Sequence, residues 1–68
     1  MDNLVLLGNF IDPNEAHIVK GLLESEGIPS FIFGELAAAF VPLPGSIRLM
    51  VRESDLEKAR NLLSREND

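Results

Sequence analysis

The sequence predicts a small α+β domain with the element order β-α-β-β-α, and the main observation behind this prediction is a pattern that occurs twice. In each occurrence, a short apolar run leads into a capped amphipathic helix that ends in Leu-Leu. The two runs are residues 4–10 and 47–51, and the helices that follow them are residues 13–26 and 55–65. A third apolar run, residues 30–33, lies between the two units. Because both helices have to bury an apolar stripe, we expect them to cover one face of a small sheet.

The first predicted helix has clear signals at both of its ends. Asp12 suits the N-cap, and Pro13 suits the first helical position. Gly27 can adopt the left-handed conformation that ends many helices, and Ile28 can make the hydrophobic contact that accompanies it. Gly21 inside the helix costs up to about 1 kcal/mol relative to alanine, and either close packing or contact with a partner would explain it. The apolar stripe of this helix consists of Ala16, Val19, Leu22 and Leu23.

The two remaining strands and the second helix are also marked in the sequence. Pro29 prevents the first helix from continuing, and residues 30–33 are rich in aromatic and β-branched side chains, which favours a strand. Residues 47–51 alternate, which places three apolar side chains on one face of a strand: Ile47, Leu49 and Val51. The second helix opens with Ser54 and Glu57 in the spacing of a capping box.

This order of elements predicts a topology. The first two strands would be parallel and joined by a right-handed helical crossover, and the third strand would lie between them, antiparallel to both. The result is a three-stranded antiparallel sheet in the order 1-3-2 with two helices on one face, a ferredoxin-like βαββα arrangement that lacks one strand. The few polar residues after Arg65 are too short for a fourth strand, so the first strand is left with an unpaired edge.

Two apolar surfaces of this predicted sheet lack cover. The first strand has no charged residue or proline to protect its edge. If alternate residues of that strand point to the helices, Leu4 and Leu6 point to the opposite face, near Met50 and Ile32. Because two helices can cover only one face, we expect another segment or another molecule to cover this one.

The segment between the second and third strands is a candidate for that role. Residues 35–46 are long for a hairpin connection, which usually has about two to five residues, and they are mostly apolar. We call this segment the flap and expect helical turns over residues 35–40, followed by an extended exit imposed by Pro42 and Pro44. Such a flap either folds onto the open face of the sheet or docks on another molecule. The candidate partner-binding residues are therefore Leu4, Leu6, Phe40, Val41 and Leu43.

Length and composition exclude several classes of protein. A chain of 68 residues holds one domain, residues 1–68, with a thin core. The absence of cysteine excludes disulfides and thiolate metal sites and fits a reducing compartment. The net charge of −5 disfavours nucleic-acid binding, and no apolar run approaches the roughly 20 residues of a membrane span. With Asp2 where a signal peptide has a basic region, we expect a cytoplasmic protein.

The sequence contains no clear catalytic or metal-binding constellation. His17 lies opposite the apolar stripe of its helix, so we expect it to be exposed and without the orienting partner that a general base needs. Ser54 is assigned to helix capping, and the other serines have no evident base beside them. The glycines are isolated and form no phosphate-binding loop. We expect no enzymatic activity, no cofactor and no metal site.

Arg48 and Arg52 are expected on the same face of the third strand, with Met50 between them. Two interpretations remain open for this pair. The arginines are either solvated side chains paired with surface acids, or they form a binding site for an anionic ligand or an acidic partner on the open face.

Several motifs resemble one bacterial family. They are Glu15-Ala16, the stretch Gly21–Ile28, Leu49-x-Val51, and Asp55 with Ala59 and Leu62-Leu63. In this pattern the chain resembles the small bacterial family of putative prokaryotic signal-transducing proteins. The resemblance implies a βαββα module related in shape to nitrogen-regulatory PII proteins, and it implies no particular activity.

Two hypotheses of function follow from these observations. The first is a non-enzymatic regulatory or adaptor module that acts through protein–protein contacts in signal transduction, with a homodimer through the first-strand edge or the flap. The alternative is a sensor domain that binds a small anionic metabolite on the open sheet face, with Arg48 and Arg52 as the ligand-binding residues.

Overall fold

The computed structural model describes residues 2–41 and 43–66 and contains every predicted element. The first strand and the first helix end within a residue of their expected limits. The third strand includes one more residue than expected, and a short 3-10 turn comes before the last helix. In chain order the elements are β1 (Leu4–Phe10), α1 (Pro13–Ser25), β2 (Ser30–Phe33), α2 (Glu35–Phe40), β3 (Ile47–Arg52), η1 (Glu53–Asp55) and α3 (Leu56–Glu66).

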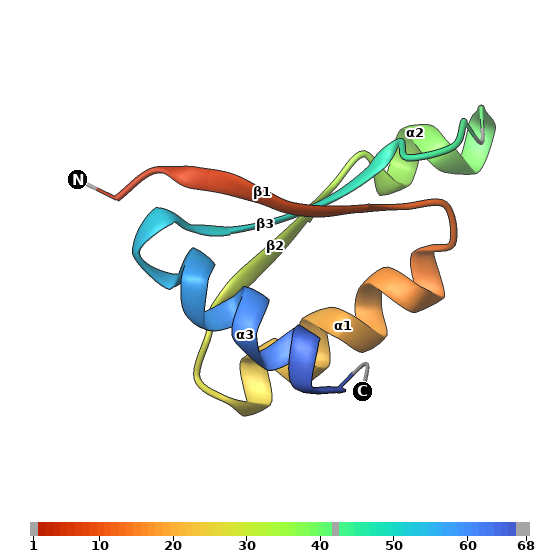
Figure 1. The fold of residues 1–68 in the computed structure, drawn as a ribbon. Helices are drawn as coiled ribbons and strands as arrows, with labels where there is room; N and C mark the ends of the chain where they lie inside the picture. The colour runs from red at the N-terminus through yellow and green to blue at the C-terminus, as the bar shows by residue number, and fades with distance from the viewer. Residues whose placement is uncertain (1, 42, 67–68) are drawn as a thin grey trace.

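The elements form two layers, as predicted. The three strands are antiparallel neighbours in the order β1-β3-β2, which is the ferredoxin-like βαββα arrangement. Helices α1 and α3 lie on the same face of the sheet, and α2 lies at the end of the sheet where β2 leads into β3 (Figure 1). The molecule measures 33 × 32 × 16 Å. A helix with its side chains is about 10 Å wide, so the thin dimension holds one helix layer and one sheet.

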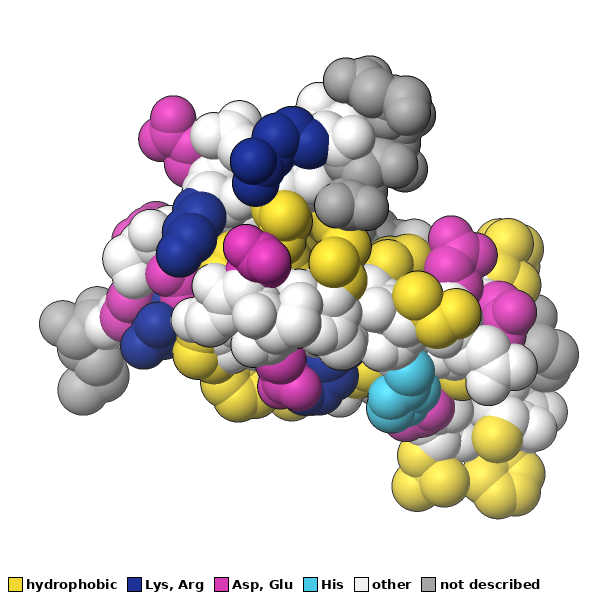
Figure 2. Space-filling model, turned by 90° about the horizontal axis from the view of Figure 1, so that it is seen from below, with side chains coloured by type: hydrophobic (Ala, Val, Ile, Leu, Met, Phe, Trp, Pro, Cys, Tyr) yellow, Lys and Arg dark blue, Asp and Glu magenta, His cyan; other side chains and the backbone are white. Residues whose placement is uncertain are grey.

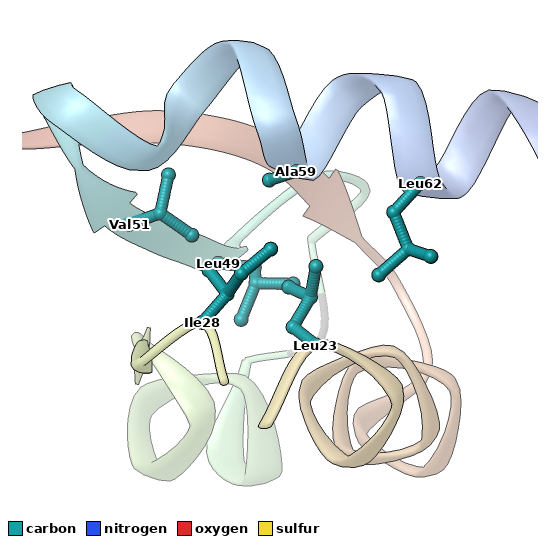
Figure 3. Close-up of a cluster of buried hydrophobic side chains, with 6 residues drawn as sticks. All are labelled: Leu23, Ile28, Leu49, Val51, Ala59 and Leu62. Atoms are coloured by element: carbon teal, nitrogen blue, oxygen red, sulfur yellow. The ribbon is translucent and has the colours of Figure 1, made fainter. Parts of the chain in front are cut away.

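The helix layer presents a mixed surface to solvent. Acidic and basic side chains lie close together on it (Figure 2), and Lys20 forms an ion pair with Glu24 one turn further along α1. The opposite side of this layer supplies the core. Side chains from β3, α3 and the end of α1 converge there (Figure 3), and the buried cluster consists of Leu23, Ile28, Leu49, Val51, Ala59 and Leu62.

The end of α1 forms the predicted left-handed stop. Gly27 has a φ of 81°. Its N–H donates to the Glu24 carbonyl at 3.0 Å, and the Ile28 N–H donates to the Leu23 carbonyl at 2.9 Å. These two bonds are those of a Schellman motif. Ile28 is 1% exposed and packs in the same cluster as Leu23, so the end of the helix also aims a large side chain into the core.

The two long helices begin in different ways. The Asp12 carboxylate accepts from the Asn14 N–H at 2.9 Å, which confirms the predicted cap of α1. The predicted capping box at Ser54 is wrong, because Ser54 lies inside the turn η1 rather than ahead of a helix. Its N–H and its hydroxyl both donate to the carboxylate of Asp2. The cap comes from the start of the chain, 52 residues away, which local spacing does not reveal.

A β-bulge in β1 changes which residues face the core. Leu6 pairs with Met50 and Gly8 pairs with Leu49, so Leu7 is an extra residue in the ladder. Strict alternation would have placed Phe10 on the open face. The bulge shifts the frame, and Phe10 instead packs against the core.

The expected position of Ile32 on the open face is wrong. Ile32 pairs with Leu49 of β3 and packs against the core, so it faces the helices. Phe31 and Phe33 face the opposite side, where they pair with Met50 and Arg48. The three consecutive apolar residues of this short strand fit either frame equally well, and only the pairing of the strand with β3 selects one.

We predict opposite effects for alanine substitutions at two glycines. Gly34 has a φ of 86°, and a Cβ there would lie 2.3 Å from the Ser46 carbonyl oxygen. Gly34→Ala should therefore lower the free energy of unfolding by about 2 kcal/mol or more. A Cβ at Gly21 would meet no atom within 4 Å, which excludes close packing as the reason for this glycine. Gly21→Ala should raise the stability by up to about 1 kcal/mol. Urea denaturation measures the free energy of unfolding of both variants, and equal changes relative to the wild type would contradict the prediction.

We also predict an acid-sensitive contribution from Asp2. The Ser54 hydroxyl donates to this carboxyl and is the main cause that lowers its pKa below the ordinary value of 3.8. A lowered pKa stabilises the fold fully above 3.8, and this contribution disappears as the pH falls through the lowered pKa. Asp2→Asn should therefore be less stable than the wild type near neutral pH, and the gap should close in acid. Ser54→Ala, which removes the main donor, should behave similarly. Acid unfolding measures this difference. A difference in stability between wild type and Asp2→Asn that stays constant as the pH falls would refute the prediction.

Candidate functional site

The side of the sheet that faces away from α1 and α3 is the open face, and it has an apolar centre. Leu6, Met50 and Phe31 form one row across all three strands. The neighbouring rows contain Leu4 with Arg52, and Asn9 with Arg48 and Phe33. The predicted placement of Leu4, Leu6 and both arginines on one face is thus confirmed by the strand register.

The apolar side chains of the open face are exposed to a similar degree. Leu4, Leu6, Phe31 and Phe33 retain between 40% and 43% of their accessible surface. Single exposed apolar residues are common on proteins, but adjacent large ones usually mark an interaction surface. These four residues surround the half-buried Met50, so the centre of the open face is a continuous and accessible apolar surface.

The described residues of the flap do not cover this surface. Its helix α2 buries Ala38, which packs with Ala16 of α1 and Ile47 of β3 on the helix side of the sheet. The large described apolar side chains of the flap are exposed, namely Leu36 (78%), Phe40 (79%), Val41 (59%) and Leu43 (60%). Pro42, expected to help impose an extended exit, lies outside the described residues. Of the two predicted roles of the flap, folding onto the open face is therefore not observed.

His17 and Glu35 connect the flap to the body of the domain. The His17 Nε2 atom lies 2.7 Å from a carboxylate oxygen of Glu35, the first residue of α2. His17 is exposed as predicted, with 54% of its side chain accessible. The expectation that it has no partner is wrong, because Glu35 is 18 residues away and only the fold brings it close. The histidine lies beside an acidic side chain, near hydrophobic side chains at one corner of the molecule (Figure 2).

The two arginines of the open face differ in their surroundings. Arg52 donates from Nε to a carboxylate oxygen of Asp55 at 2.9 Å, and its Nη2 atom forms an ion pair with the same oxygen, also at 2.9 Å. Arg48 has no ion-pair partner among the residues described by the structure. Its neighbours across the sheet are Asn9 and Phe33. Among the residues that the structure describes, Arg48 is therefore the arginine of this face whose charge is not paired.

Other kinds of site find little support in the described part of the chain. Within residues 2–41 and 43–66, no group of three or more His, Asp or Glu side chains is arranged to hold a metal ion. No described helix is long and apolar enough to cross a membrane. An open hollow at the end of α1 is lined by Glu24, Gly27, Ile28 and Pro29, and neither Arg48 nor Arg52 is among its lining residues.

Comparison with known proteins identifies the family of the chain. No curated protein and no solved structure matches it. A family model described as "Putative prokaryotic signal transducing protein" matches residues 5–67, which is nearly the whole chain. This range includes the elements that form the core, the open face and the flap, except Leu4, the first residue of β1. The chain therefore belongs to the family of putative prokaryotic signal transducing proteins.

Proposed function

We propose that this protein is a non-enzymatic regulatory or adaptor module that works through contacts with other protein chains, including a second copy of itself. The family description points to signal transduction in prokaryotes. The observation that carries the proposal is the exposed apolar surface of the flap. The following paragraphs give the physical reasons for a protein as the partner.

The flap has the shape and chemistry of a protein contact. Leu36 and Phe40 come from α2, and Val41 and Leu43 follow it, so one short segment presents four large exposed apolar side chains. Small-molecule sites are usually concave and bury most of their ligand. The flap instead projects from one end of the sheet (Figure 1). A projecting apolar segment gains most by inserting its side chains into a groove of another protein.

The edge of β1 is a second place for contact, but a short one. β1 pairs with β3 alone, so its outer edge faces no other described strand. The bulge at Leu7 interrupts this edge, and bulges are one way in which proteins protect edges. Only residues 4–6 precede the interruption. We therefore assign self-association to the flap first, with Leu4 and Leu6 in a secondary role.

A non-enzymatic role is supported by the surroundings of the polar side chains. The Ser54 hydroxyl is bound to Asp2, and the Ser25 hydroxyl donates to the Leu22 carbonyl. His17 and Glu35 are hydrogen-bonded to each other at the surface, where water has free access. A general base works best close to the proton it removes and in a shielded site.

Sedimentation of the purified protein tests the proposed self-association. The wild type should form dimers at high micromolar concentration, and Phe40→Ser should weaken the dimer by about tenfold or more because it removes the largest exposed side chain of the flap. Ile18→Ser is the matched control, since Ile18 is 71% exposed on α1 and lies outside the flap. A strict monomer that Phe40→Ser leaves unchanged would reject self-association.

Arg48 supports a second candidate function, a sensor for a small anionic metabolite on the open face. A thermal-shift screen of metabolic anions should then find a stabilising compound, because a ligand that binds only the folded state raises its stability. Arg48→Ala should abolish this shift. Arg60→Ala, which removes an exposed arginine of α3, should leave it intact. A shift that survives in Arg48→Ala would exclude this site.

A further inference from the structure

We propose that the open face binds an acidic amphipathic helix of a partner protein. The axis of this helix would run along β3, so that the helix crosses the row Leu6, Met50 and Phe31 and places a carboxylate against Arg48. The inference rests on the proposed function, because it assumes that the domain acts through protein contacts. It adds the chemical class of the partner and uses a surface other than the flap.

The distribution of charge selects an acidic partner. The protein carries a net charge of −5, yet the rows of the open face contain two arginines and no acidic residue. At one end of this face, Asp55 already pairs with Arg52, and Asp2 is bound to Ser54. At the other end, Arg48 lies among Asn9, Phe33 and Met50. An acidic segment is the partner whose charge this end complements.

The same charge disfavours a second copy as the occupant. Two open faces packed about a twofold axis contact each other through identical residues. Arg48 of one copy would then meet a face whose own rows contain no acidic residue to pair with it.

The dimensions of the face fit one helix. Neighbouring strands lie about 4.8 Å apart, so the row from β1 to β2 is about 10 Å wide, close to the width of a helix. Arg48 and Met50 are two residues apart on β3, which is about 6.7 Å. Four residues of a helix rise about 6 Å. A glutamate four positions from a leucine therefore reaches Arg48 when the leucine lies over Met50.

The apolar row favours a peptide helix over a small anion, because a small anion has no apolar surface to place against it. Leu6 and Phe31 flank Met50, an unbranched side chain that adapts to the shape of a partner. An apolar helix face against such a row is an established mode of peptide recognition. It would also place a second helix layer on the sheet, so that both faces are covered as they are in larger α/β proteins.

Fluorescence anisotropy with synthetic peptides tests the proposal. The probe is a labelled helical peptide with leucines along one side and a glutamate four positions from a central leucine. Two control peptides replace the glutamates by glutamine or the leucines by serine. The wild-type protein should bind the probe saturably and each control peptide about tenfold or more weakly, and added salt should weaken probe binding.

A charge reversal provides the matched protein variants. Arg48→Glu should lose about tenfold or more of its affinity for the probe and should bind a peptide with lysine in place of glutamate better than the wild type does. This gain shows that the variant is folded. Arg60→Glu makes the same change in net charge on the outer surface of α3 and should bind the probe nearly as the wild type does.

Three results would overturn the inference. One is the absence of saturable binding of the probe to the wild type, which leaves the flap and the Phe40→Ser result untouched and so separates this inference from the proposed function. Another is binding of citrate alone that Arg48→Glu abolishes, with peptide binding that does not depend on the leucines, which indicates a small-anion site. The third is a wild-type dimer that Met50→Asp separates, which assigns the open face to a second copy.

Discussion

The structure depends on one constraint: α1 and α3 cover only one face of a three-stranded sheet. Strand β3 shows this most clearly, because its residues alternate between the two environments. Ile47, Leu49 and Val51 are completely buried against the helices, whereas Arg48 and Arg52 are exposed on the other side. With no further layer in a molecule 16 Å thick, every apolar residue that the flanking strands direct away from the helices stays accessible to a partner.

An exposed sheet face is not unusual in itself, because antiparallel sheets often have one face in water. Such faces are normally polar. β3 follows this rule with its arginines, but β1 and β2 do not, since Leu6 and Phe31 point outward beside Met50. The face therefore combines a charged central strand with apolar outer strands. This combination is the physical basis for a partner that offers both a carboxylate and an apolar surface.

Local signals were enough to predict the elements and the strand order. The Asp12 cap, the stop at Gly27 and the alternation in β3 each depend on a few neighbouring residues, and all three were confirmed. The errors concern contacts between distant parts of the chain. The Asp2–Ser54 cap joins residues 52 positions apart, and the frame of β2 depends on its pairing with β3. The bulge in β1 has a local hint only in Gly8, whose missing side chain eases the irregularity.

The open face and the flap differ in how the fold supports them. The open face rests directly on the core, because Met50 lies between the buried Leu49 and Val51. The backbone that carries its side chains is fixed by the strand pairing before any partner arrives, which lowers the entropic cost of binding. The flap is held to the body by Ala38 and by the hydrogen bond between His17 and Glu35. Because both attachments lie on the helix side, a partner on the open face would leave them intact.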